Sequence, residues 1–417
     1  MRHPTRGNGG FSLLEVMVAS SISLIVLAAA LWSAAELQRR GVLEESLMGA
    51  QNAMRAVRDL LVVELQRAGT GAGSARLVAG TRAGVADVHY ALTISTAEAF
   101  DGNGLFPADS NFARPTGPYA SRISDALQAW SWDTEAQDAA GAAIPLLPLD
   151  LCPAAAGGAP ALYRNGNVLC PRANPTALLN RLVMVVKPAT RTSCLMQVTA
   201  VDTSTTPPQI TVTPGLPGNP PPSGDVCATP PAAPSSDYTR FWSRDSTGAF
   251  IVPVRGVSFR INWKSGGPVL ERLEQTSDLT QNTSWVALSQ DVEQLRVRLG
   301  VTSNLAQLNA DLLWFPSTSP IRPAIDACDA ACDALVPVAG WAPGADEPTS
   351  RDALMRRVRM VELTMTTRTS RADPSMAKRD GSGFVLDVDG NPRDGYKRRT
   401  ATVELMPRNF AYAGVTP

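Results

Sequence analysis

The chain has few of the residues that most often carry out chemistry. It holds two histidines, His3 and His89, among 417 residues. Two histidines exclude most histidine-based zinc sites and leave a single candidate for a histidine-dependent triad. No G-x-S-x-G motif surrounds a serine, so nothing in the sequence marks a nucleophile. We therefore expect the chain to be neither an enzyme nor the carrier of a cofactor.

The chain also lacks an excess of charge, with 38 basic and 38 acidic residues. Proteins that bind nucleic acid usually carry a basic surplus, so we expect no nucleic-acid partner. Two clusters of cations depart from this balance, and phosphate contacts require only clustered cations. We interpret these clusters as strand residues that face solvent or pair with another subunit: Arg356, Arg357, Arg359, Lys397, Arg398 and Arg399.

Charge is scarcest near the N-terminus. Residues 11–35 contain one charged side chain, Glu15, and no proline. A helix of that length, at ~1.5 Å per residue, can cross a hydrocarbon core of ~30 Å. A transmembrane anchor explains the segment, and a secretory signal cut after Ala30 is a second interpretation. The apolar run continues past Ala30, and a carboxylate fits poorly inside the apolar part of such a signal.

A third interpretation accounts for Glu15. A charge at the centre of a membrane costs about 2.5 kcal/mol or more, and such residues usually have a partner. Cleavage between Gly10 and Phe11 would leave an α-amino cation on Phe11, one helical turn before Glu15. In a stack of similar helices, Glu15 of one subunit could then pair with the Phe11 amine of its neighbour.

Residues 10–15, with the sequence GFSLLE, resemble the class III signal of type IV pilins and of type II secretion pseudopilins. The resemblance implies that a prepilin peptidase removes the leader, residues 1–10, and methylates Phe11. It also implies that Glu15 acts in assembly. Many major pilins have a helix-kinking proline in this segment, and this sequence has none.

The helical pattern continues from residue 36 to residue 68. Charged side chains at Arg55, Arg58, Asp59 and Glu64 fall outside its apolar stripe, and we expect the helix to end near Arg67, before a run of glycines. The stripe itself follows spacings of three and four: Leu43, Leu47, Ala50, Met54, Val57, Leu61, Leu65 and Ala68. The whole N-terminal helix would be about 57 residues long, roughly 85 Å.

Residues 69–417 are expected to form a β-rich head. Apolar or alternating runs predict seven strands near residues 181–187, 194–201, 209–213, 257–263, 295–301, 361–365 and 401–405. This pattern indicates an α+β fold in which a long N-terminal helix packs on an antiparallel sheet. Residues 134–177 and 203–237 are rich in proline, glycine or alanine. We expect both stretches to be surface insertions, which are loops or places where a partner binds.

A finer resemblance, to the PilW group of minor pilins, comes from four segments. The helix end ELQRAGTGAG, the segment DVEQLRVRLGV, the strand RRVRMVELTMTTRTS and the ending YKRRTATVELMPRNF carry it. In the ending, the matching positions are Arg398, Arg399, Leu405, Arg408 and Asn409, with Met406 and Pro407 as an apparent insertion. Residues 75–250 match nothing in that group.

This resemblance implies a structural role. The protein would be a minor pilin that helps initiate type IV pilus assembly, held in the inner membrane by residues 11–35 with a periplasmic head. It would then enter the pilus at or near its tip. Its partners would be prepilin peptidase, other minor pilins, the major pilin and a tip adhesin. Two alternatives stay open: a J-type pseudopilin of a type II secretion system, and a periplasmic binding protein with an ordinary signal.

Six cysteines on a chain threaded into an oxidising periplasm indicate disulfides. Proximity in the sequence predicts three pairs: Cys194 with Cys227, Cys152 with Cys170, and Cys328 with Cys332. A zinc site would need histidine or C-x-x-C companions, which are absent.

One acidic segment could supply oxygen ligands to calcium: Asp387, Asp389, Asn391 and Asp394. In an EF-hand, however, the position of Pro392 requires a glycine and that of Arg398 a bidentate acid. We interpret the segment as a hairpin turn and expect no metal.

Overall fold

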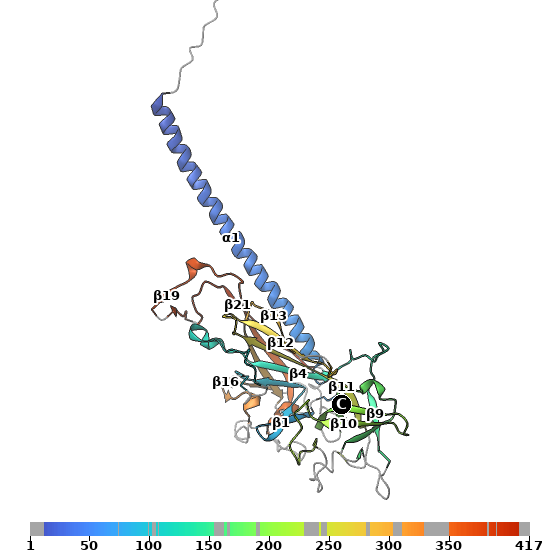
Figure 1. The fold of residues 1–417 in the computed structure, drawn as a ribbon. Coiled ribbons are helices and arrows are strands. Elements are labelled where there is room, and N and C mark those ends of the chain that lie inside the picture. The colour runs from blue at the N-terminus through green and yellow to red at the C-terminus, as the bar shows by residue number, and fades with distance from the viewer. Residues whose placement is uncertain are drawn as a thin grey trace, which may run out of the picture.

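A computed structural model of the chain (Figure 1) describes most of its length. The described residues are 12–73, 75–98, 100–101, 106, 108–153, 162–164, 167–188, 192–228, 242, 248–280, 284–302, 311–328, 350–381, 383–388 and 390–407.

A single helix, α1 (Leu13–Arg67), makes up the N-terminal part of the described chain and is 55 residues long. Ser12 caps it, and no proline interrupts it. Past the C-cap residue Ala68, Gly69 adopts a φ of 78°, a conformation that favours glycine and ends the helix. The predicted end near Arg67 is confirmed. The first half of α1 projects away from the head, and the second half lies along it (Figure 1).

The predicted apolar stripe is the face that α1 buries in the head. Leu61, Leu65 and Ala68 are fully buried, and Ala50 and Val57 nearly so. One expectation was wrong: Glu64, placed outside the stripe because of its charge, is 5% exposed. It lies three residues after Leu61 and four before Ala68, so helical geometry puts it on the buried face. Charged side chains of the head pair with the Glu64 carboxylate and offset the cost of its burial.

The larger of the two main sheets has 13 strands. Their bounds are β1 (Arg76–Arg82), β2 (Val85–His89), β3 (Leu92–Ser95), β4 (Ala126–Trp132), β5 (Leu147–Asp150), β6 (Tyr163–Arg164), β7 (Val168–Pro171), β8 (Leu182–Lys187), β9 (Thr192–Asp202), β10 (Gln209–Pro214), β11 (Phe250–Asn262), β12 (Val269–Gln275) and β13 (Trp285–Ser289). The main path runs β13-β12-β11-β5-β7-β10-β9-β1-β2. The pairs are antiparallel except β1 with β9.

The second main sheet has four antiparallel strands in the order β15-β14-β18-β21. They are β14 (Val292–Thr302), β15 (Leu312–Phe315), β18 (Val358–Arg368) and β21 (Arg398–Leu405). Two short hairpins, β16 (Ser317–Thr318) with β17 (Ile321–Arg322) and β19 (Arg379–Asp380) with β20 (Gly383–Phe384), lie outside both sheets. The other helices among the described residues are short: η1 (Gly117–Arg122), η2 (Thr176–Leu178), η4 (Ile325–Ala327), α4 (Ser350–Arg356) and η5 (Pro374–Met376).

The long strand β11 joins the two ends of the larger sheet. Its start pairs with β5 and β8, and its remainder pairs with β4 and β12. Around its remainder, one apolar core gathers side chains of β3, β4, β11, β14 and β18 with Val57, Leu61 and Leu65 of α1. A second core lies between β7, β8, β9 and β10. Helix α1 thus contributes to the first core, whereas strands and the segments that connect them form the second.

All seven predicted strands are present, as β8, β9, β10, β11, β14, β18 and β21. The α+β fold with a long N-terminal helix on largely antiparallel sheet is therefore confirmed. The expectation that residues 134–177 form loops was wrong in part, because β5, β6 and β7 lie there. Leu147, Leu149 and Leu169 of these strands are buried, so a few apolar residues outweigh the loop-like composition around them.

Candidate functional site

The N-terminal end of α1 is a capping box formed by Ser12 and Glu15. The backbone N–H of Glu15 donates to Ser12 Oγ at 3.2 Å, and the backbone N–H of Ser12 donates to Glu15 Oε2 at 3.3 Å. The carboxylate of Glu15 therefore lies over the first helical turn, where free N–H groups favour a negative charge. Gly10 and Phe11, the predicted cleavage and methylation residues, lie outside the described residues.

The first half of α1 presents apolar side chains that nothing in the described chain covers. Helix α1 is long and apolar enough to cross a membrane, and its most apolar window has no buried residue. Such exposed side chains are typical of a helix that contacts a membrane or other helices. They are Leu13, Leu14, Val16, Met17, Val18, Ile22, Leu24, Ile25, Val26, Leu27, Leu31 and Trp32.

A buried charge network fixes the second half of α1 to the head. Glu64 Oε1 lies 3.0 Å from Arg255 Nη2 on β11 and 3.3 Å from Arg272 Nη2 on β12. Glu274 contacts the same two arginines, at 2.5 and 2.8 Å. Two acids and two arginines thus balance at the helix–sheet contact. One feature of the sequence indicates that Glu64 is buried: it lies at helical spacing between Leu61 and Ala68.

A second polar contact fixes α1 nearer its middle. Arg39 Nη2 donates to both carboxylate oxygens of Asp373, at 2.7 and 2.8 Å, and to the hydroxyl of Ser375. Asp373 belongs to the connection between β18 and β21. Sequence reasoning missed this pair, because 334 residues separate its members.

Four cysteines of the described chain form two disulfides, of which Cys194–Cys227 belongs to the second apolar core. Cys152 pairs with Cys170, and Cys194 pairs with Cys227, as proximity in the sequence predicts. The Cys194 bridge holds the segment after β10 against β9. Cys328 is disulfide-bonded, and Cys332 lies outside the described residues.

The acidic segment that could bind calcium is a turn whose carboxylates are already engaged. Asp387 Oδ1 accepts the backbone N–H of Asn391 at 2.7 Å, and Leu386 bridges to Pro392. Asp394 bonds to Arg398 instead, and Asp389 lies outside the described residues. This is the geometry of the predicted hairpin turn. Among the described residues, no group of three or more histidine, cysteine, aspartate or glutamate side chains could hold a metal ion.

Arg398, one of the predicted cluster cations, is not a solvent-facing strand residue. Its guanidinium lies 2.6 Å from a Glu293 oxygen and 2.6 Å from an Asp394 oxygen, and its side chain is 10% exposed. Tyr119 donates to Asp394 at 2.9 Å. Burial raises the pKa of Asp394, but Arg398 outweighs burial and, with Tyr119, holds that pKa below its ordinary value of 3.8. Arg398 therefore serves to fasten β21 to the rest of the head.

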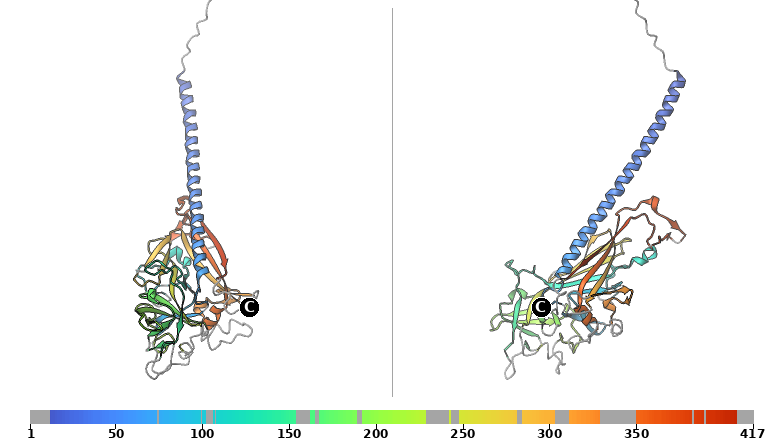
Figure 2. Two further views of the ribbon diagram at one scale, coloured as in Figure 1. Left: turned by 90° about the vertical axis from the view of Figure 1, so that its right-hand side faces the viewer. Right: turned by 180° about the vertical axis from the view of Figure 1, so that it is seen from behind.

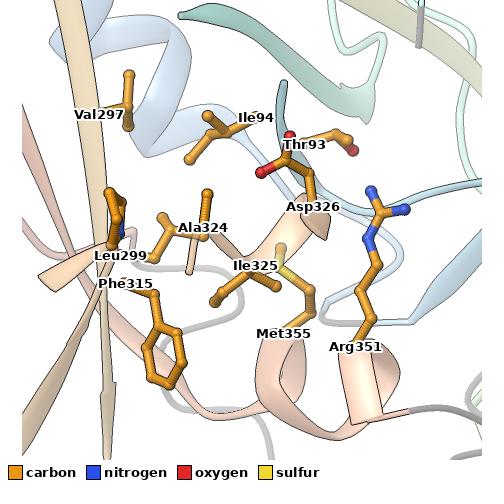
Figure 3. Close-up of a pocket in the computed structure, with 11 residues that line it drawn as sticks. Thr93, Ile94, Val297, Leu299, Phe315, Ala324, Ile325, Asp326, Arg351 and Met355 are labelled. Atoms are coloured by element: carbon orange, nitrogen blue, oxygen red, sulfur yellow. The ribbon is translucent and has the colours of Figure 1, made fainter. Parts of the chain in front are cut away.

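A small apolar cavity lies between β14, η4 and α4 (Figure 3). Its volume is about 10 Å³, enough for about one water molecule. Ile94, Leu299 and Ile325 line it, and Arg351 and Asp326 lie to one side (Figure 3). A space of this size cannot hold an organic ligand.

His89 does not form a catalytic arrangement with the residues around it. It is 3% exposed, with Gln128 at 2.6 Å and Asp87 at 3.0 Å from its ring nitrogens. Gln128 also accepts from the indole of Trp130 and donates to Ser258, whose hydroxyl is 3.2 Å away. The histidine thus satisfies buried polar groups where β2 faces β4.

One comparison with known proteins identifies the N-terminal segment. Residues 5–31 match the family model described as the prokaryotic N-terminal methylation motif. No curated protein matches the chain. Among solved structures, a type IV-like pilin from Thermus thermophilus is similar at 12% identity and a TM-score of 0.18, over 56% of this chain and 87% of that one. The chain thus begins with a methylation motif of the type IV prepilin kind, which runs into the exposed apolar half of α1.

Proposed function

We propose that the protein is a minor pilin that helps initiate type IV pilus assembly. The observation that carries the proposal is the position of the methylation motif. It leads into a helix whose first half is uncovered and whose second half belongs to the core of the head. One half of α1 is then available to a membrane or a filament core, and the other carries the head.

In the proposed mechanism, prepilin peptidase removes residues 1–10 in the inner membrane and methylates Phe11. Glu15 then exchanges its bonds to Ser12 for the Phe11 amine of a neighbouring subunit. This pairing fixes the axial register of the two helices, because an unpaired charge inside an apolar bundle is costly. The head would face the periplasm before assembly and the cell surface afterwards, at or near the pilus tip.

The test combines mass spectrometry with one substitution. We expect the protein isolated from its own membrane to begin at Phe11 with one added methyl group. Glu15→Val should leave the protein in the membrane but abolish its co-purification with other pilins. Ser20→Val changes an exposed helix residue in the same segment and is the matched control. Undiminished co-purification of Glu15→Val would remove the mechanism.

Deletion of the gene separates the two assembly roles that share this motif. Loss of surface pili with normal protein export supports the minor pilin. Blocked export with normal pili supports a J-type pseudopilin of a type II secretion system. An N-terminus near Leu31, or an uncut Met1, would contradict both and favour a periplasmic protein with an ordinary signal or anchor.

A further inference from the structure

The connection between β18 and β21, residues 369–397, is the part of the head nearest to the apolar half of α1 (Figures 1 and 2). The Arg39–Asp373 ion pair joins it to the helix. Arg39 lies four residues beyond Ala35, the end of the apolar segment, which corresponds to ~6 Å along a helix. A bilayer that holds residues 11–35 would therefore have its surface close to this connection.

The connection exposes three large apolar side chains. Met376 and Leu386 are each 50% exposed, and Val388 is 99% exposed. Apolar side chains in this number on one exposed connection indicate a surface that contacts something less polar than water.

Hydrogen-bonded turns hold these side chains in place. Asp373 caps η5, which ends at Met376. The backbone N–H of Val385 donates to the carbonyl of Lys378 at 3.0 Å, and the carbonyl of Val385 accepts the backbone N–H of Arg393 at 2.8 Å. Leu386 and Val388 flank Asp387, whose carboxylate accepts the backbone N–H of Asn391 at 2.7 Å and closes the turn. The apolar side chains are thus displayed from a fixed backbone.

Exposed cations surround the apolar side chains. Arg371, Lys378 and Arg393 are exposed, and none of them forms an ion pair with another described residue. Two of the nearby acids, Asp373 and Asp394, are paired with arginines. The connection contains five cations and five acids, and these two acids pair with Arg39 and Arg398, which lie outside it. Five cations therefore remain against three acids, Asp380, Asp387 and Asp389.

We propose that the β18–β21 connection docks on the surface of the bilayer that holds residues 11–35. Met376, Leu386 and Val388 enter the interfacial layer, and Arg371, Lys378 and Arg393 contact anionic phospholipid headgroups. Apolar side chains beside cations are the combination that binds such an interface. The inference rests on the membrane anchoring in the proposed function. The docked connection is a second attachment of the protein to the membrane, beside the anchor helix. This attachment must be released when the subunit leaves the bilayer.

The test places an environment-sensitive dye on the connection. The full-length Val388→Cys chain, labelled with a nitrobenzoxadiazole maleimide, is put one copy at a time into nanodiscs of neutral or partly anionic phospholipid. The introduced thiol is selective because no cysteine of the described chain is free. The matched control is Val85→Cys, at the exposed first residue of β2, which pairs with the end of β1. Strand β1 lies in the part of the head away from the apolar half of α1 (Figure 1).

We expect the dye at position 388 to shift to shorter wavelength in anionic nanodiscs and to be quenched by headgroup spin-labelled lipid. The dye at position 85 should behave as it does in water. Replacing Arg371, Lys378 and Arg393 with glutamine should reduce the docked population, by roughly fivefold for each cation at low salt. Added salt should also reduce the docked population, because it screens the attraction between these cations and the headgroups.

Three results count against the proposal, and they are distinguishable. A dye at position 388 that remains aqueous in chains that are stably inserted shows that anchoring holds without docking. If the chains do not insert into any nanodisc, the anchoring is contradicted. Both this inference and the membrane stage of the proposed function are then wrong. Equal quenching in neutral discs and for the glutamine variant would remove the role of the headgroup charge.

Discussion

Glu64 Oε1 on α1 lies 3.0 Å from Arg255 Nη2 on β11, and the two side chains are 6% and 8% exposed. A pair this deeply buried is held by mutual attraction that offsets the loss of water around both ions. Removing one member leaves the other buried and short of a partner. This pair is therefore the most sensitive polar contact between the helix and the sheet.

We predict that Glu64→Ala destabilises the full-length chain in detergent by about 3 kcal/mol, because Arg255 and Arg272 then share Glu274 alone. Urea unfolding followed by circular dichroism measures the change. Asp59→Ala is the matched control on the same helix, since the Asp59 side chain is 65% exposed and pairs with its neighbour Arg58. Equal midpoints for the two variants would show that the network contributes nothing.

The Asp394–Arg398 pair should make stability depend on pH in acid. The folded-state pKa of Asp394 is below its ordinary value of 3.8, so its contribution is fully present above that pH. The contribution is lost as the pH falls from 3.8 towards the folded-state pKa. We expect Asp394→Asn to be less stable than the parent chain at pH 7, with the difference narrowing below pH 3.8. A difference that stays constant between pH 7 and pH 2.5 would contradict this assignment.

The two described disulfides should differ in the stability that each provides. Cys194–Cys227 closes 33 residues and Cys152–Cys170 closes 18. Loop-closure entropy then predicts losses of roughly 3.5 and 3 kcal/mol when each pair is replaced by alanine. Urea unfolding of the two double variants measures both losses in otherwise identical chains. A larger loss from the shorter loop would show that local packing, and not chain entropy, sets their contributions.

Two glycines should respond to alanine in opposite directions. A Cβ on Gly41, inside α1, would meet no atom within 4 Å, so Gly41→Ala should stabilise the helix by about 0.5–1 kcal/mol. A Cβ on Gly256 of β11 would lie 2.8 Å from the ring of Trp130, so Gly256→Ala should destabilise by about 1–3 kcal/mol. Thermal unfolding of both variants checks the sign. If Gly256→Ala also stabilised the protein, the Trp130 ring would have to move aside freely.

Periodicity predicted the parts of the fold that follow one simple pattern. The stripe through Leu61 and Leu65 follows from helical spacing, and the helix end at Arg67 follows from the glycines after it. Strand β18 follows from the alternation of apolar and polar residues over 361–365. Strands that break the pattern were not foreseen. β12 reads VLERLEQ, and its charged side chains are satisfied by partners such as Arg255, which no local pattern can indicate.

Sequence reasoning likewise identified one part of the candidate site and missed another. Glu15 stands out in the sequence because it is one charge in a long apolar run. Arg39 and Glu64 look like ordinary surface charges, since their partners lie more than a hundred residues away. Arg398 looks the same, because one of its two partners, Glu293, is 105 residues away. Their roles depend on tertiary contacts, which a single sequence does not reveal.

The unbroken course of α1 has a mechanical consequence. The segment that a membrane or filament would hold and the segment that completes the core of the head are one rod without a proline or a loop between them. A pull along the apolar half therefore reaches Val57, Leu61 and Glu64 with no flexible element to absorb it. The head must turn whenever the anchor turns, so the tilt of the first 25 helical residues sets the direction in which the far end of the head points.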